Sequence, residues 1–170
     1  MNTTAHPADQ AYDPEQLTPL LAMVRTAAHS QGTAHARASA ELRRATRRDP
    51  LAAYAHAMTL AAHIGRQLRD VYSVDDMIGE AILLTELHSL GLPPGLIVPS
   101  LLPTAALIGG ADGTLADQKA GDPTTWTVAA RVNQTLAVGL LHVLAEATEE
   151  CPGDVADRVC AQVQAMTRPA

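Results

Sequence analysis

The sequence predicts an all-α protein, a single-domain helical bundle of five to seven helices around a buried central helix at about residues 74–90. Hydrophobic residues make up 47% of the 170-residue chain, but aromatic residues only 2%, and Phe is absent. Aliphatic residues and alanine must therefore fill the core, and alanine is the strongest helix former. Apolar residues also recur at three- and four-residue spacing, and Asp-Pro pairs mark several helix starts.

The first helical segment is predicted to follow a flexible tail. Residues 1–12 are polar and aperiodic, which leaves 13–170 as the helical domain. Asp13 and Pro14 fit the cap and the first position of a helix. The apolar spacing continues on both sides of Gly32, so one long helix and two shorter helices both fit the pattern. The apolar positions are Leu17, Leu21, Val24, Ala28, Ala38, Leu42 and Ala45.

The next helix is predicted to start at Asp49 and Pro50 and to reach about Tyr72. It places His56 and His63 on its polar side, about 10.5 Å apart along the axis. These two alone are too far apart to share a metal, so we expect a wet surface or the wall of a cleft. An arginine cluster precedes this helix. Its positive charge complements the negative C-terminal end of the dipole of the preceding helix, and a contact with phosphate is the alternative interpretation. The cluster consists of Arg43, Arg44, Arg47 and Arg48.

Both ends of the predicted central helix are marked in the sequence. Ser73 and Asp76 form a capping box, and Gly91 can adopt the left-handed conformation that ends a helix. Apolar residues spread around most of the helical wheel, which is typical of a buried helix. Glu80 and His88 fall within that spread, so we expect both to be buried. They are the candidate catalytic residues, as a general acid and base, and paired structural roles are the alternative.

A connection rich in Pro and Gly is predicted at 91–122. Pro99 and Pro103 disfavour a continuous helix, so we expect a short apolar helix at 100–108. A second capping box at Thr114 predicts another brief helix. Connections of this length are often lids or binding loops, but the many Leu and Ile residues here favour a cover for one end of the bundle.

The longest helix is predicted from Asp122 and Pro123 to about Glu149. Asn133 projects into its apolar arc and should be buried, where it needs a hydrogen-bond partner. A last amphipathic helix is predicted at 155–166.

Charge and composition bear on localisation and partners. The net charge of −6 gives no general reason to bind nucleic acid or an anionic membrane. The N-terminus does not resemble a signal peptide, and the apolar stretch 96–110 is too short to span a membrane. We therefore expect a cytoplasmic protein without membrane contact, in which Cys151 and Cys160 remain thiols. His142 and Glu146 stand one turn apart but lack further ligands, so no metal site is predicted and the cofactor is unknown.

The segment TELHSLGLPPGLIVPSLLPTAALIGGADG resembles the helix-turn-helix of winged-helix regulators. The resemblance consists of a helix containing Glu86, a turn at 91–93, a segment in the place of the recognition helix, and a wing at 112–113. It implies a transcriptional regulator. However, two prolines fall inside the supposed recognition helix, and residues 89–118 contain no Lys or Arg to contact DNA. We therefore expect at most a degenerate relative, and nucleic acid is not an expected partner of this segment.

Three functions fit these observations. We favour a helical interaction or accessory protein that forms a homo-oligomer or binds a protein partner through the alanine-rich faces of its first helices. The alternative is a small helical-bundle enzyme or small-molecule-binding protein that uses Glu80 and His88 in an internal pocket. A degenerate winged-helix-like regulator, contacting DNA through the arginine cluster, is the third. For the second function, the candidate ligand-binding residues are Asn133, Tyr54 and Arg131.

Overall fold

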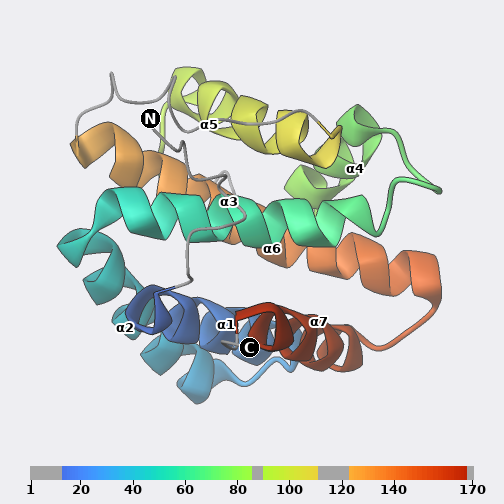
Figure 1. The fold of residues 1–170 in the computed structure, drawn as a ribbon, viewed down its shortest axis with the longest axis horizontal. Helices are drawn as coiled ribbons and strands as arrows, with labels where there is room; N and C mark the ends of the chain where they lie inside the picture. Colours follow the sequence, from blue (N-terminus) through green and yellow to red (C-terminus); the bar gives the residue numbers. More distant parts are fainter. Residues whose placement is uncertain (1–12, 86–89, 111–122, 168–170) are drawn as a thin grey trace, which may run out of the picture.

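The computed structural model describes residues 13–85, 90–110 and 123–167. Within these ranges the chain forms seven α-helices and no strand (Figure 1), so the prediction of an all-α bundle is confirmed. The predicted tail at 1–12 and the predicted helix after Thr114 lie outside the described residues. The helices are α1 (Pro14–Ala28), α2 (Gly32–Arg48), α3 (Pro50–Arg66), α4 (Val74–Leu83), α5 (Pro94–Ile108), α6 (Pro123–Thr148) and α7 (Pro152–Thr167).

The helices lie in three layers in Figure 1. α3 and α6 form the middle layer and make the most extensive helix–helix contact in the described structure. α4 and α5 pack on one side of this pair, and α1, α2 and α7 on the other. The core therefore centres on α3 and α6. Their fully buried side chains include Leu60, Ile64, Leu136 and Leu140.

The first helical segment forms two helices. Ser30 adopts a positive φ of 54° between α1 and α2, which reverses the chain direction. Asp13 caps α1 as predicted, because its carboxylate accepts a hydrogen bond from the amide of Glu15. The expectation of a wet surface around His56 is wrong, since this side chain is buried. The reason is that the start of α1 covers it, and His56 Nε2 accepts a hydrogen bond from the Asp13 amide at 3.0 Å.

The helix that begins at Val74 is shorter than predicted. Its N-terminal cap is confirmed, since the hydroxyl of Ser73 accepts a hydrogen bond from the Asp76 amide at 3.1 Å. The helix ends at Leu83 instead of near residue 90. One side is buried and packs on α6, whereas the opposite side is exposed, although the sequence predicts burial around most of the helix. The residues on the buried side are Met77, Ile78 and Ala81.

α5 is longer than the sequence predicts. It begins at Pro94 instead of near Ser100 and contains Pro99 and Pro103 within a continuous helix. Each internal proline deprives the carbonyl four residues earlier of its amide partner. Those carbonyls belong to Gly95 and Pro99, both of which are exposed, so water can hydrate them. The prediction of a shorter helix was wrong because these exposed carbonyls do not need an amide partner within the helix.

α6 and α7 closely match their predicted ranges. α6 is the one helix among the described residues that is long and apolar enough to cross a membrane, but 72% of its apolar window is buried inside the bundle. That burial is what a central core helix requires. α6 therefore presents different sides to α3, α4, α5 and the α1–α2 pair. Side chains on different sides of α6 consequently lie in different surroundings.

Candidate functional site

The predicted catalytic pair is not placed in an internal pocket. Glu80 is exposed on the outer side of α4, so its expected burial is wrong. The physical reason is that α4 buries only one side against α6, and Leu83 is exposed at 75% on the solvent side as well. His88 lies outside the described residues.

Asn133 is fully buried in α6, and its predicted need for a partner is confirmed. Its Oδ1 accepts a hydrogen bond from the hydroxyl of Thr104. Its Nδ2 donates to the carbonyls of Ser100 and Ala129, each at 2.9 Å.

The other candidate ligand-binding residues are Tyr54 and Arg131. Tyr54 is buried in α3. Arg131 is half-buried and lines a groove. Because Arg131 and Asn133 are two positions apart on a helix, their side chains point to opposite sides. The sequence-predicted residues therefore do not form one site.

The groove beside Arg131 has a volume of about 670 Å³. It lies between the α1–α2 pair and α6, and Leu84, Thr85 and Leu90, which follow α4, also line it. Turn residues Ser30 and Gln31 contribute at one end. Its apolar lining residues are Met23, Ala27, Leu42, Leu84, Leu90 and Val138, and its polar side chains include those of Thr26, His35, Ser39, Arg43, Thr85, Arg131, Gln134, Thr135 and His142.

A buried hydrogen bond fixes α2 against α6 at one end of this groove. The Nε2 of Gln134 donates to the hydroxyl of Thr46 at 3.1 Å. Arg43 lies three residues before Thr46, and Arg131 lies three residues before Gln134, so each is about 4.5 Å along its helix from that bond. Because α2 runs against the direction of α6 (Figure 1), Arg43 and Arg131 lie on opposite sides of that bond, about 9 Å apart along the helices.

Two histidines line the groove farther along. α2 runs against the direction of α6 (Figure 1), so residues before Thr46 lie beside residues after Gln134. His35 and His142 therefore lie on the same side of the Gln134–Thr46 bond, roughly 12–16 Å from it along the helices. We call this the histidine end.

His35 is held by hydroxyl groups. Thr26 donates its own proton to the Ala22 carbonyl at 2.8 Å, so its oxygen is left to accept from His35 Nδ1–H at 3.3 Å. The Nε2 of His35 then accepts from the hydroxyl of Ser39 at 3.4 Å. These two long contacts favour the tautomer with a proton on Nδ1.

The charges on the described groove wall have one sign. Its lining contains Arg43 and Arg131 but no Asp or Glu among the residues that can be described. Neither guanidinium has an ion-pair partner within the described ranges. No three His, Cys, Asp or Glu side chains in those ranges are placed to hold a metal. The groove is therefore suited to an anion with an apolar part.

Comparison with protein families, with curated proteins and with solved structures found no match.

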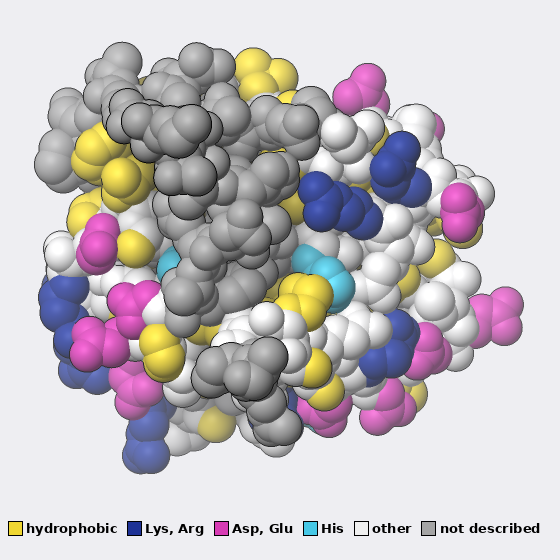
Figure 2. Space-filling view, in the orientation of Figure 1, with side chains coloured by type: hydrophobic (Ala, Val, Ile, Leu, Met, Phe, Trp, Pro, Cys, Tyr) yellow, Lys and Arg dark blue, Asp and Glu magenta, His cyan; other side chains and the backbone are white. Residues whose placement is uncertain are grey.

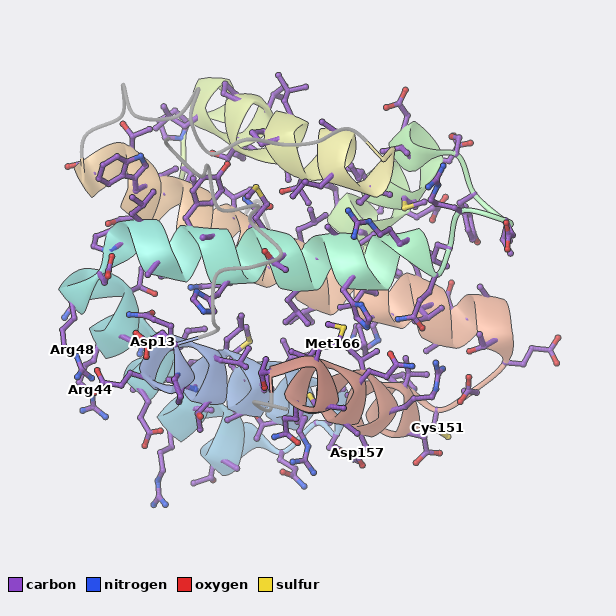
Figure 3. All side chains as sticks on the ribbon, viewed as in Figure 1. Asp13, Arg44, Arg48, Cys151, Asp157 and Met166 are labelled. Carbon is purple, nitrogen blue, oxygen red and sulfur yellow. The ribbon has the colours of Figure 1, made fainter. Side chains whose placement is uncertain are left out.

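The remaining arginines of the cluster have a different setting. Arg44, Arg47 and Arg48 are exposed and do not line the groove, and Figure 3 shows Arg44 and Arg48 at the outer end of α2. Arg48 lies 3.8 Å from the carboxylate of Glu15. α5, in the place of the supposed recognition helix, contains no Lys or Arg and packs on α3 and α6.

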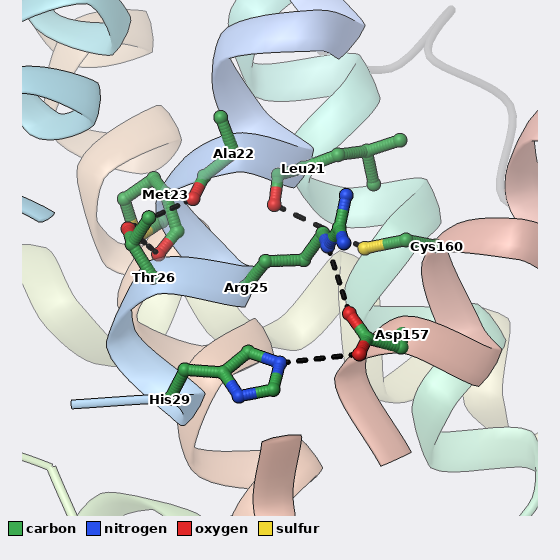
Figure 4. A network of polar contacts seen from close by, with 8 residues as sticks. All are labelled: Leu21, Ala22, Met23, Arg25, Thr26, His29, Asp157 and Cys160. Carbon is green, nitrogen blue, oxygen red and sulfur yellow. Dashed lines mark hydrogen bonds and ion pairs between the residues drawn. The ribbon is translucent and has the colours of Figure 1, made fainter. Parts of the chain in front are cut away.

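A second polar cluster joins α1 to α7 (Figure 4). Asp157 accepts hydrogen bonds from Arg25 Nε at 2.9 Å and from His29 Nε2 at 3.2 Å. Slight burial raises the pKa of Asp157, but these hydrogen bonds and the nearby positive charges outweigh it and lower the pKa below the ordinary value. Burial raises the pKa of the nearby Cys160 thiol to about 11, which leaves it an unreactive packing residue.

Sequence reasoning missed most of the groove because its walls come from separate helices. A partial signal was present, since Arg131, Thr135 and His142 recur along one polar stripe of α6. His35 also interrupts the apolar spacing of α2. No sequence pattern, however, related the stripe on α6 to the residues on α2.

Proposed function

We propose that this protein binds a small organic anion in the groove between the α1–α2 pair and α6. The observation that carries this proposal is that Arg43 on α2 and Arg131 on α6 both line a groove whose described lining has no acidic residue. A protein of net charge −6 here presents two cations for which the described residues supply no carboxylate partner. This proposal retains the small-molecule-binding alternative from the sequence. It places the ligand beside Arg43 and Arg131 instead of Glu80 and His88.

The size and chemistry of the groove support this proposal. Small-molecule sites have volumes of roughly 300–1,000 Å³ and combine apolar walls with a few polar groups that orient the ligand. The groove volume of about 670 Å³ falls in that range. Hydrogen bonds between guanidinium groups and an anion are among the stronger ones in proteins, so two arginines can orient an acid group.

The test is the binding of hexanoate and of inorganic phosphate to the full chain, measured by isothermal titration calorimetry at low salt. Replacing Arg43 or Arg131 by Gln should weaken binding by roughly 10- to 100-fold, since a hydrogen bond to a charged group contributes about 1.5–3 kcal/mol. Arg44→Gln and Arg47→Gln are matched controls, because they remove the same charge from α2 outside the groove. If neither probe binds, or if all four variants weaken binding equally, the proposal is wrong.

A second candidate function is protein–protein interaction, which α5 supports. This helix contains no charged residue between Pro94 and Ile108, and Val98 and Leu102 are exposed at 60% and 62% on it. Figure 2 shows hydrophobic side chains at the edge of the molecule where α5 lies. Large apolar patches on a protein surface often mark interaction sites.

This candidate requires a different surface from the one the sequence suggests. Several alanines of the first helices are buried in the core of the chain itself, so they do not face a partner. These are Ala28, Ala38 and Ala45. We therefore place the proposed self-association on the outer side of α5.

A further inference from the structure

We propose that Ser39 is a nucleophile with His35 as its general base, and that this pair hydrolyses small carboxylic esters in the groove. Both residues lie on α2 and line the groove. The reaction goes beyond anion binding, because an uncharged ester does not need the arginine contacts on which the proposed function depends.

The hydrogen bonds of His35 have the order that nucleophilic catalysis uses, in which a base contacts the nucleophile and a third group orients the base. The hydroxyl of Ser39 donates to His35 Nε2 at 3.4 Å, and His35 Nδ1–H donates to the Thr26 oxygen at 3.3 Å. Thr26 donates its own proton to the Ala22 carbonyl at 2.8 Å (Figure 4). Both contacts of His35 are long, which is common for catalytic hydrogen bonds before a substrate binds.

Ser39 is accessible from the groove. Ser39 and His35 are both half-buried, and so is Val138 on the facing wall of α6. Along the helices, Val138 is about 6 Å and Ser39 about 10.5 Å from the Gln134–Thr46 bond, on the same side of it, so the two lie within one helical turn of each other. An acyl group of a few carbons can therefore pack on Val138 while its carbonyl meets Ser39.

The reaction has two steps. Ser39 Oγ bonds to the carbonyl carbon of the ester while its proton passes to His35 Nε2. The tetrahedral intermediate then expels the alcohol, which takes this proton from His35, and the acyl group stays on Ser39. Water attacks the acyl group in the second step, again through His35, and releases the acid and the free Ser39 hydroxyl. Water is the only reactant needed besides the ester.

Arg43 is placed to stabilise the negative charge of the tetrahedral intermediate. It lies one turn after Ser39 on the same face of α2 and lines the same groove. Long side chains on a helix lean toward its N-terminus, which from Arg43 is the direction of Ser39. A cation beside the developing oxyanion lowers the barrier to its formation.

The test is the hydrolysis of p-nitrophenyl acetate by the full chain, followed by the release of p-nitrophenolate. Ser39→Ala and His35→Gln should each lower kcat by at least about 100-fold, since a positioned general base contributes roughly 10²–10⁴-fold. His63→Gln and Thr148→Ala are matched controls, because they remove an imidazole and a hydroxyl outside the groove and should leave kcat unchanged. Thermal unfolding of each variant shows whether it folds.

A covalent probe identifies the nucleophile directly. Diisopropyl fluorophosphate reacts with an activated serine, whose oxygen displaces fluoride from phosphorus. Mass spectrometry of the digested protein should find the adduct on Ser39 in the wild type. The adduct should be absent from His35→Gln, because this variant keeps the Ser39 hydroxyl but lacks its base.

Thr26 is a positioning residue, since it holds the His35 tautomer that leaves Nε2 free to accept a proton. Thr26→Val should lower kcat several-fold and leave KM unchanged. Thr26→Ser keeps the hydroxyl and should restore kcat. If Thr26→Ser is as slow as Thr26→Val, the hydroxyl does not position His35.

Wild-type hydrolysis no faster than that of Ser39→Ala would overturn the proposal, as would an adduct on another residue. Equal losses in His35→Gln and His63→Gln would assign the activity to imidazole groups in general. Anion binding is measured separately by calorimetry, and Ser39→Ala leaves both groove arginines in place. The esterase can therefore fail while the anion site stands, and the reverse.

Discussion

Asn133 joins α6 to α5 by polar contacts inside an otherwise apolar core. We predict that Asn133→Ala lowers the free energy of unfolding by about 2–3 kcal/mol, because it leaves the buried hydroxyl of Thr104 without its partner and removes the hydrogen bond to the Ser100 carbonyl. Guanidinium-induced unfolding followed by circular dichroism measures this loss. Thr148→Ala is the control on the same helix, since it removes only a hydroxyl bonded to its own helix and should cost less than about 0.5 kcal/mol. Equal losses in the two variants would contradict the role of Asn133.

Asp157 makes a pH-dependent contribution to the contact between α1 and α7. Its pKa is lower in the folded chain, so its ion pairs stabilise the fold above the unfolded pKa and lose that contribution as the pH falls through the folded pKa. Asp157→Asn should therefore lower the unfolding free energy by less than about 1 kcal/mol near neutral pH, since the pair is exposed. As the pH falls from neutral toward about pH 2, the difference from wild type should shrink, because the carboxylate becomes protonated.

Urea unfolding at both pH values measures this effect. Asp70→Asn is the control, because Asp70 is exposed and no ion pair is found for it in the described structure. A difference between wild type and Asp157→Asn that persists unchanged at about pH 2 would assign the effect to something other than the carboxylate charge.

Single residues were predictable where one helix determined their surroundings. Asn133 lies between apolar neighbours on both adjacent turns of a long helix, so its burial followed from the spacing alone. Glu80 also lies among apolar residues, but α4 is short and is covered on one side only. The sequence of α4 does not contain the information about which neighbours cover it, so the same reasoning was wrong there.

At the scale of helices, the backbones of α4 and α6 approach each other closely at Gly139. A Cβ atom at this position would lie 2.5 Å from the carbonyl oxygen of Ala81. Alanine normally stabilises a helix by about 1 kcal/mol relative to glycine, but here it would force α4 away from α6. We predict that Gly139→Ala lowers the unfolding free energy by about 1–3 kcal/mol, the usual cost of overpacking.

The matched control for Gly139 lies on α4 itself. Gly79 is helical and exposed, and a Cβ atom there would meet nothing within 4 Å. Gly79→Ala should therefore raise the unfolding free energy by about 0.4–1 kcal/mol. Chemical unfolding of the two variants should give changes of opposite sign, and a stabilising Gly139→Ala would show that α4 can move from α6 without loss.

Helix starts were more predictable than helix ends. Asp13, Asp49 and Ser73 each cap a helix at the predicted position, because capping depends on a side chain and an amide only a few residues apart. The end of α4 and the start of α5 were missed. Both depend on which sides of these helices meet α6 and α3, and no local sequence pattern determines that.

At the scale of the whole molecule, the groove follows from how three separate segments pack. α3 and α6 fill the middle layer with aliphatic side chains, and α2 meets α6 only through a limited contact near Thr46. The space beside that contact is lined by residues far apart in the sequence. The all-α class was therefore predictable from composition and spacing, whereas the site required the arrangement of helices in space.

The outer side of α5 gives the last prediction, which concerns the association of whole molecules. If two copies meet through this side, Leu102→Glu places a charge in the interface and should weaken self-association at least tenfold, or about 1.4 kcal/mol. Because Leu102 is 62% exposed in the single chain, the unfolding free energy should change by less than about 0.5 kcal/mol. Sedimentation velocity over a wide range of concentrations measures the association. Met166→Glu is the control, since Met166 is 54% exposed on α7, in the layer opposite α5 (Figure 3). A wild-type protein that stays monomeric would rule out an α5 interface. Equal weakening of self-association by both variants would rule it out as well.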